Sequence, residues 1–276
     1  MDRIERSCVT VEFDEGIAWV ILSRPEKRNA MSPTLNREML EVLEDLELDE
    51  RCGIVVLTGA GDSFSAGMDL KEYFRETEKL SPSQVRRVRQ TAYAWQWRKL
   101  MHYPKPTIAM VNGWCFGGAF TPLVACDLSF AADEAVFGLS EINWGIIPGG
   151  NVTKAVADKL RPADALFYIM TGRNFDGRKA AEMGLVNESV PRAELRDHVR
   201  ALAMELMGKN LTVMNGAKIA FKQVRTMSWD ASEDYLGSKA AQVRAQDKSA
   251  GRERGLTQFL DDKSYRPGLE GYSKDG

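Results

Sequence analysis

The sequence contains few of the residues that build metal sites and disulfides. Its 276 residues include 4 cysteines and 2 histidines. No two cysteines form a C-x-x-C pair, and His102 and His198 lie far apart without metal-ligand spacing around them. The first six residues carry both charge signs and precede no apolar stretch of the signal-peptide type. We therefore expect a cytoplasmic protein with reduced thiols and without a metal site.

The chain also lacks an excess of positive charge. Its 37 Lys and Arg residues are balanced by 39 Asp and Glu residues, which gives a formal net charge of −2. This balance argues against the broad basic surface of a nucleic-acid-binding protein. The apolar segment 106–132 is long enough to cross a bilayer, but residues such as Asn112, Pro122 and Asp127 interrupt it. No membrane span is expected, and a small molecule is the expected partner.

Nucleotide-binding glycine motifs are absent as well. A G-x-G-x-x-G pattern that began at Gly59 would need glycine where Phe64 stands, and no G-x-x-x-x-G-K-[ST] occurs. This argues strongly against the usual Rossmann and P-loop phosphate sites. The glycine-rich loops of this chain therefore need another explanation.

Apolar runs of strand length alternate with helical patterns over the first part of the chain. Two Ser-Pro pairs each supply an N-cap and a proline at the first helical position. The predicted elements are a hairpin of strands 9–13 and 17–22, a helix from 33, a strand over 54–57, a helix from about 68, a helix from 82, a strand over 107–111, a loop over 113–118 and a helix through 125. This alternation predicts an α/β core, whereas the chain from Arg192 onward has helical periodicity.

Two of these segments lead from a strand end into a helix start, at Ala66-Gly67-Met68 and at Gly117-Gly118-Ala119. Backbone N–H groups at such positions have no intrahelical acceptor. Two of them that converge on one point form an oxyanion hole, which stabilises a developing negative charge. Met68 and Gly118 are therefore candidate oxyanion donors. The alternative is that these glycines only permit tight turns and close packing.

Four motifs occur in the order found in the crotonase superfamily, also called the enoyl-CoA hydratase/isomerase superfamily. They are residues 24–30 (RPEKRNA), 64–70 (FSAGMDL), 112–118 (NGWCFGG) and 137–141 (FGLSE). The chain resembles that superfamily over nearly its whole length. The resemblance implies an α/β fold in which a spiral of ββα units forms two nearly perpendicular sheets, followed by a helical C-terminal part. It places the CoA and acyl site in residues 1–200, and it assigns trimerisation and active-site cover to residues 201–276.

The resemblance also assigns roles to individual residues. Carried over position by position, these are oxyanion donors at Met68 and Gly118, a CoA contact at Lys27, backbone neighbours of the nucleotide at Ala66 and Leu70, and acyl-site walls at Ser140 and Trp144. CoA belongs to the acyl-CoA thioester substrate, so no separate cofactor is implied. The expected assembly is a homotrimer or a dimer of trimers.

The catalytic carboxylates decide which branch of the superfamily the chain resembles. Ordinary hydratases of this superfamily use two glutamates, of which the second matches Glu141 and the first falls on Thr121. A hydroxyl can hydrogen-bond to water, but it cannot serve as the general base of a two-carboxylate mechanism. A single glutamate with a small hydroxyl residue is similar to the hydroxycinnamoyl-CoA hydratase-lyase branch. Two tyrosines bind the para-hydroxyl of the substrate in that branch, and they match Tyr73 and Tyr235.

That branch implies hydration of feruloyl-, coumaroyl- or caffeoyl-CoA, followed by retro-aldol cleavage to a 4-hydroxybenzaldehyde such as vanillin and acetyl-CoA. We expect Glu141 to deliver a proton toward the α-carbon while water, positioned partly by Thr121, adds at the β-carbon. Glu141 then removes the β-hydroxyl proton, and partial burial would raise its pKa toward neutrality. Two alternatives stay open: a crotonase-type hydratase or isomerase for non-phenolic acyl-CoA, and a non-catalytic acyl-CoA-binding protein.

Overall fold

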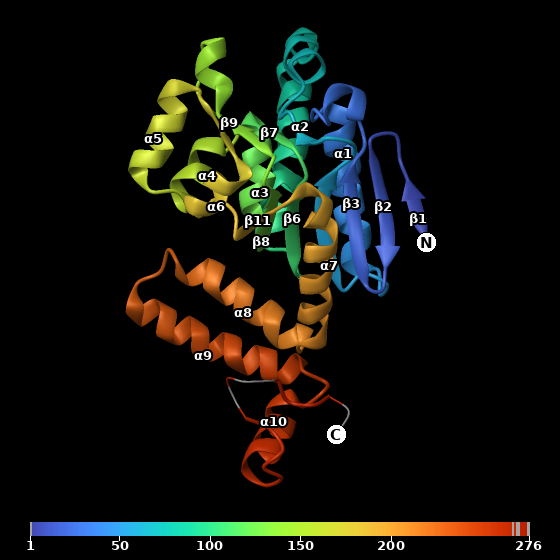
Figure 1. Cartoon of the computed structure of the whole chain (residues 1–276), viewed down its shortest axis with the longest axis vertical. Coiled ribbons are helices and arrows are strands. Elements are labelled where there is room, and N and C mark those ends of the chain that lie inside the picture. Colours follow the sequence, from blue (N-terminus) through green and yellow to red (C-terminus); the bar gives the residue numbers. More distant parts are fainter. Residues whose placement is uncertain (1, 267, 269–270, 275–276) are drawn as a thin grey trace. The chain divides into compact units, whose positions relative to one another are not determined.

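The computed structural model describes residues 2–266, 268 and 271–274 of the chain (Figure 1). The chain divides into two compact units, Met1–Ala203 and Met204–Gly276. All strands of the described residues belong to the first unit, and the second unit is helical. No helix in the described part of the chain combines the length and apolar character that crossing a membrane requires.

The first unit contains a sheet of seven strands. Their order is β1 (Arg3–Glu5), β2 (Val9–Asp14), β3 (Ile17–Leu22), β4 (Ile54–Gly59), β6 (Thr107–Val111), β8 (Leu128–Ala132) and β11 (Glu188–Val190). β1, β2 and β3 are antiparallel and lie side by side in Figure 1, whereas β3 to β11 run parallel. The predicted hairpin is confirmed, with Val9 opposite Leu22. Both faces of β4 and β6 are buried, which explains their continuous apolar sequences.

A second sheet in the same unit has four strands. Their order is β10 (Asn174–Asp176), β9 (Val136–Gly138), β7 (Trp114–Phe116) and β5 (Ser63–Ser65). β9, β7 and β5 are parallel, and β10 is antiparallel to β9. The pairs β4 and β5, β6 and β7, and β8 and β9 each give one strand to each sheet before the chain turns into a helical segment. The repeated ββα units and the two sheets expected from the resemblance are therefore present.

Helices accompany these strands. They are α1 (Pro33–Leu48), α2 (Pro82–Tyr93), α3 (Phe120–Ala125), α4 (Val152–Lys159), α5 (Pro162–Thr171), α6 (Gly177–Glu182) and α7 (Arg192–Gly208), the last of which contains the boundary between the two units. The predicted start of α1 is confirmed, because Ser32 Oγ accepts a hydrogen bond from the Leu35 N–H at 3.1 Å. Its apolar face is buried through Leu35, Met39 and Leu43, so amphipathic burial stabilises the helix in place.

Two predictions near the loops need correction. The segment 113–118 contains the strand β7, which is too short to show a period in the sequence. The helix predicted from about position 68 begins at Leu70, as a π-helical turn over Leu70–Arg75. Asp69 sets this start, since its Oδ1 accepts the N–H groups of Lys71 at 3.0 Å and Glu72 at 2.8 Å.

The second unit consists of helices in the described residues. After the end of α7 come α8 (Leu211–Val224), α9 (Trp229–Gln246) and α10 (Gly251–Leu260), and α8 lies beside α9 in Figure 1. Side chains cap two of these helices, because Asn210 Oδ1 accepts from the Val213 N–H and Ser228 Oγ from the Ala231 N–H. The helical periodicity predicted for this part of the chain is confirmed.

Candidate active site

Three parallel strands of the small sheet, β5, β7 and β9, lead into the candidate site. Carboxyl ends of adjacent parallel strands lie at the same edge of a sheet, so the segments that follow them converge. Met68 follows β5, Gly118 follows β7 and Glu141 follows β9. All three residues line one cavity of ≈ 1150 Å³. The topology thus brings together the residues that the sequence assigns to oxyanion stabilisation and proton transfer.

The backbone N–H of Met68 points away from Met31, to which both neighbours of Met68 are hydrogen-bonded. Gly67 O accepts from the Met31 N–H at 2.8 Å, and the Asp69 N–H donates to Met31 O at 3.1 Å. In a parallel bridge of this kind, the residue between the two bonded groups directs its own N–H to the opposite side. The described residues provide no acceptor for that N–H. Met68 therefore offers a free donor beside the cavity.

The Gly118 N–H lies next to the same space. A methyl group built on Gly118 would lie 3.4 Å from the Met68 nitrogen, and one built on Gly67 would lie 3.0 Å from the Gly118 nitrogen. Within the described ranges this N–H also lacks an acceptor. Two free N–H groups around one small space have the arrangement of an oxyanion hole. Glycine is needed at position 118 because a side chain would enter that space.

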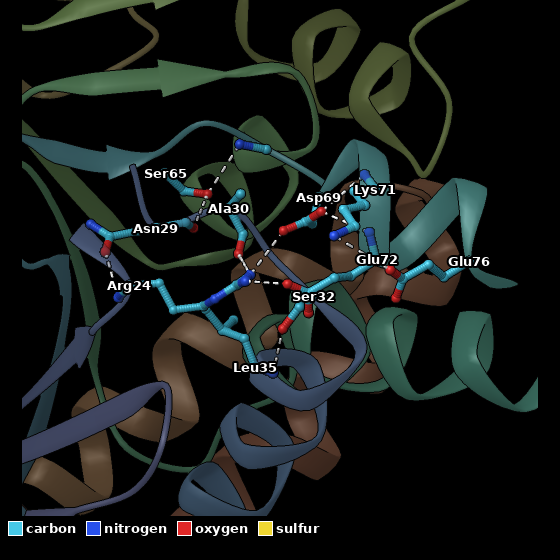
Figure 2. Close-up of polar contacts among 11 residues, drawn as sticks. Arg24, Asn29, Ala30, Ser32, Leu35, Ser65, Asp69, Lys71, Glu72 and Glu76 are labelled. Atoms are coloured by element: carbon cyan, nitrogen blue, oxygen red, sulfur yellow. Dashed lines mark hydrogen bonds and ion pairs between the residues drawn. The ribbon is translucent and has the colours of Figure 1, made fainter. Parts of the chain in front are cut away.

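A buried arginine holds the segment that carries Met68 (Figure 2). The Arg24 guanidinium donates to Ala30 O at 2.7 Å, to Asp69 Oδ2 at 3.1 Å and to Glu72 Oε1 at 2.6 Å. Arg24 is 8% exposed and Asp69 is 6% exposed, so water screens this pair little. Burial by itself raises the pKa of the Asp69 carboxyl, but hydrogen bonds from the Glu72 N–H and from Arg24 hold it below its usual value. One cation thus fixes Asp69, the residue that follows Met68.

Further hydrogen bonds fix Gly67, the residue before Met68 (Figure 2). The Gly67 N–H donates to Ser65 Oγ at 3.1 Å, and the Ser65 hydroxyl donates to Asn29 O at 2.9 Å. The Asn29 side-chain amide donates to Ser63 O at 2.8 Å. The segment after β3 therefore holds both sides of Met68, which explains why the RPEKRNA and FSAGMDL motifs occur together.

Glu141 lies on a 3₁₀ turn over Ser140–Trp144, directly after β9. A methyl group built on Gly117 would lie 2.9 Å from Glu141 Oε1, so the carboxyl group occupies the space beside Gly117 that a side chain there would need. Glu141 Oε2 is buried and has no hydrogen-bond partner among the described residues. Burial raises the pKa of the Glu141 carboxyl, as the sequence predicted, against a smaller opposing effect of its own backbone N–H. Such a carboxyl group gains a proton more readily than an exposed glutamate, as a general acid–base requires.

Among the described residues that line the cavity, Thr121 is not found. Its side chain is 2% exposed, and its hydroxyl donates to Gly150 O at 2.9 Å. The hydroxyl oxygen keeps its capacity to accept a hydrogen bond, so a role of Thr121 in positioning the attacking water stays a prediction. Thr121 supports Gly150, which does line the cavity. Sequence matching gave the position of Thr121 but not the direction of its side chain.

Tyr73 lines the cavity from the π-helical turn that follows Asp69. The residue is 7% exposed, and burial raises the pKa of its hydroxyl to about 12, with a further increase from Tyr93 and an opposing effect of Arg89. Arg89, Tyr93 and Gln96 also line the cavity, and no motif in the sequence marks them. Their spacing of four and three residues on the helix from Pro82 was the available signal.

The remaining assigned residues are distributed between the two units. Lys27, Ala66, Leu70, Ser140 and Trp144 all line the cavity, and Trp144 is 65% exposed. Tyr235 lies in α9 of the C-terminal unit, and its contact with a substrate ring stays a prediction.

Comparison with known proteins agrees with this arrangement. Residues 12–266 match the family described as Enoyl-CoA hydratase/isomerase. The hydroxycinnamoyl-CoA hydratase-lyase of Pseudomonas fluorescens is 59% identical over 266 residues, which cover 96% of each chain. The human enoyl-CoA hydratase domain-containing protein 2, mitochondrial, is 34% identical over 216 residues, or 75% of this chain and 71% of that protein.

A solved structure shows the same fold. The enoyl-CoA hydratase of Bacillus anthracis aligns with a TM-score of 0.82 and 27% identity, covering 93% of this chain and 97% of that one. The family match spans most of the residues, including Met68, Gly118 and Glu141. The chain therefore belongs to the enoyl-CoA hydratase/isomerase family.

Proposed function

We propose that this protein is a lyase that hydrates 4-hydroxycinnamoyl-CoA thioesters and cleaves the product to a 4-hydroxybenzaldehyde and acetyl-CoA. The observation that carries this proposal is that only one of the carboxyl groups that line the cavity, among the described residues, is not paired with a cation. Among the described residues these are Asp69 and Glu141, and Asp69 is paired with Arg24. One carboxyl group is thus available for proton transfer, where the usual hydratase mechanism needs two. The identity to the hydroxycinnamoyl-CoA hydratase-lyase of Pseudomonas fluorescens supports the same choice.

Hydration uses the conjugation between the ring and the thioester. An ionised ring oxygen shares its negative charge with the thioester oxygen, and the N–H groups of Met68 and Gly118 stabilise the charge there. Protonated Glu141 gives its proton to the α-carbon, which leaves a quinone methide. Water adds to the β-carbon, its proton passes to Glu141, and the ring regains its charge. The net change is the addition of one water molecule.

Cleavage uses the same groups in a second step. Glu141 loses its proton to solvent and then removes the proton of the β-hydroxyl group. The bond between the α- and β-carbons breaks, the β-carbon becomes the aldehyde, and the electron pair forms the enolate of acetyl-CoA. Met68 and Gly118 hold the enolate oxygen while Glu141 returns the proton to carbon. Each oxyanion donor contributes about 3 kcal/mol to such transition states.

The other assignments complete the proposal. Lys27, Ala66 and Leu70 contact the CoA part of the substrate, and Ser140 and Trp144 line the acyl part. Tyr73 and Tyr235 bind the para-oxygen of the ring. The protein acts in the cytoplasm as a homotrimer or a dimer of trimers, with no cofactor beyond the CoA of its substrate. The assignment of Tyr235 rests on the family resemblance alone, and those of Lys27, Ala66, Leu70, Tyr73, Ser140 and Trp144 rest also on their positions along the cavity.

An incubation with feruloyl-CoA tests the proposed reaction. We expect equal amounts of vanillin and acetyl-CoA, measured by chromatography. Accumulation of only the hydrated thioester would identify a hydratase and contradict the lyase assignment. Binding of CoA thioesters without turnover, over phenolic and non-phenolic substrates alike, would indicate a non-catalytic binding protein.

A further inference from the structure

One face of the helix from Pro82 lines the cavity at three points. Arg89 and Tyr93 belong to α2, and Gln96 belongs to the π-helical turn that continues it. The spacing of four and three residues places them on one side of the helix. Gln96 marks the end of this face at the oxyanion hole, because its Nε2 lies 3.3 Å from Met68 Sδ.

Arg89 lies at the other end of the same face. Gln96 follows Arg89 by seven positions along the helix, which corresponds to about 10 Å along the helix axis. This length is comparable to that of a hydroxycinnamoyl group between its thioester oxygen and its para-oxygen. A thioester held at Met68 and Gly118 therefore places the far end of the ring near Arg89.

Tyr73 and Tyr93 face the same end of the cavity. Tyr73, Tyr93 and Arg89 all line this cavity. Burial raises the pKa of the Tyr73 hydroxyl, Tyr93 raises it further, and the Arg89 charge lowers it. A methyl group built on Gly150 would lie 3.9 Å from Tyr93 Cε1, so the Tyr93 ring faces the cavity wall formed by Gly150.

Arg89 has no carboxylate partner among the described residues. Other charged groups line the cavity, and they are Lys27, Arg28, Asp69, Lys71 and Glu141. Arg89 and Tyr93 are four residues apart on α2, so among these charged groups Arg89 is the cation on the same helix face as Tyr93.

We propose that Arg89 and Tyr93 form, together with Tyr73, a site for the ionised para-oxygen of the substrate ring, in which Arg89 supplies the positive charge. The inference rests on the proposed function, since only a phenolic ring presents such an oxygen. Arg89 stabilises the phenolate of the bound substrate and of the aldehyde product. The two tyrosine hydroxyls donate hydrogen bonds to it. The conjugated anion is then held at both ends, by Arg89 at the ring and by the two backbone N–H groups at the thioester.

The aldehyde product provides a direct measurement of this effect. Phenol and phenolate forms of 4-hydroxybenzaldehydes absorb at different wavelengths, so an absorbance titration of bound vanillin in the presence of acetyl-CoA gives the pKa of its hydroxyl. Arg89 is exposed, so solvent screens its charge and the effect lies near the lower end of the range for neighbouring charges. We expect Arg89→Gln to raise the pKa of bound vanillin by about one unit. Arg89→Lys should retain most of the wild-type value.

A matched control separates the local charge from the total charge of the helix. Arg86 lies on α2, is exposed and does not line the cavity, so Arg86→Gln should leave the pKa of bound vanillin unchanged. A thioester with a 4-methoxy ring cannot ionise, and its binding should be equal in wild type and Arg89→Gln. Tyr93→Phe should weaken vanillin binding several-fold, because it removes one hydrogen-bond donor.

The outcomes distinguish this inference from the proposed function. If vanillin binds to Arg89→Gln with the wild-type pKa, or if Arg86→Gln shifts it equally, the assigned role of Arg89 is wrong although feruloyl-CoA is still cleaved. If wild type cleaves feruloyl-CoA but binds vanillin only as the neutral phenol over the whole titration, the inference is also wrong. Failure of wild type to cleave feruloyl-CoA would instead contradict the proposed function, and the phenolate site with it.

Discussion

Substitution of Gly118 by alanine should close the oxyanion hole without unfolding the protein. Gly118 does not have a positive φ, so its backbone conformation accepts alanine. The added methyl group would lie 3.0 Å from Met68 Cγ and 3.4 Å from the Met68 nitrogen. The methionine side chain is flexible and can move, whereas the backbone N–H cannot. The methyl group would thus occupy the space between the two donors that the thioester oxygen needs.

The expected loss follows from the number of donors affected. Removal of one oxyanion donor reduces kcat by about 10²–10³, or about 3 kcal/mol. A methyl group between Met68 and Gly118 prevents both hydrogen bonds, but effects within one catalytic unit are not additive. We therefore expect a loss of at least about 10³ in kcat. The free energy of unfolding should fall by only about 1 kcal/mol, the usual cost of one extra methyl group that a flexible neighbour can accommodate.

Two assays measure this loss. One is single-turnover cleavage of feruloyl-CoA, and the other is exchange of the acetyl-CoA methyl protons with deuterated solvent, followed by NMR. The exchange needs the enolate but no phenolic ring, so it tests the oxyanion hole independently of ring recognition. Gly208→Ala is the matched control, because a methyl group there has no neighbour within 4 Å. Retention of more than a tenth of the wild-type rates in folded Gly118→Ala would refute the assignment of the two N–H groups.

Three further predictions follow from the geometry. Glu141→Gln should abolish cleavage. Burial raises the pKa of the Glu141 carboxyl in the folded protein above its value in the unfolded chain, so wild type loses stability as the pH rises between these two values. Thermal melts should therefore show the variant gaining stability relative to wild type over that pH range, and a constant difference would contradict the burial argument. Arg24→Met should lower the free energy of unfolding by about 3 kcal/mol in chemical denaturation, because buried Asp69 loses its cation. The variant should also slow the exchange of the acetyl-CoA methyl protons with solvent. A wild-type exchange rate in the folded variant would show that Arg24 does not position Met68. Thr121→Val should lower kcat less than tenfold, because the Thr121 hydroxyl already donates to Gly150 O, and a loss near that of Glu141→Gln would instead indicate a direct role in catalysis.

Arg24 illustrates how a structural residue takes part in function. Arg24 is not among the residues that line the cavity, yet its guanidinium donates hydrogen bonds to Ala30 O and to the Asp69 carboxylate. Ala30 and Asp69 both line the cavity. A buried cation between two cavity segments restricts their relative movement, as positioning of catalytic donors within a fraction of an ångström requires.

Local sequence features determined the elements that carry the site. The hairpin over 9–22, the capped helix from Pro33 and the buried strand from Ile54 were predictable because their period, caps and turn residues lie within a few positions of one another. The motifs also predicted that Met68, Gly118 and Glu141 belong to one site, and all three line the same cavity, although the bridge to Met31 that leaves the Met68 N–H free is a tertiary feature. The three-residue strands β5, β7 and β9 were not predicted, because so few residues show no period.

Tertiary structure alone decided where each side chain points. Thr121 and Glu141 were both expected beside the substrate, but the fold turns the Thr121 hydroxyl toward Gly150 and leaves Glu141 Oε2 without a partner. Arg89 and Tyr93 had no motif to mark them, and they became candidates only when α2 was seen to line the cavity. Residue type and local spacing are written in the sequence. The direction of a side chain and its neighbours depend on packing between segments that are far apart along the chain.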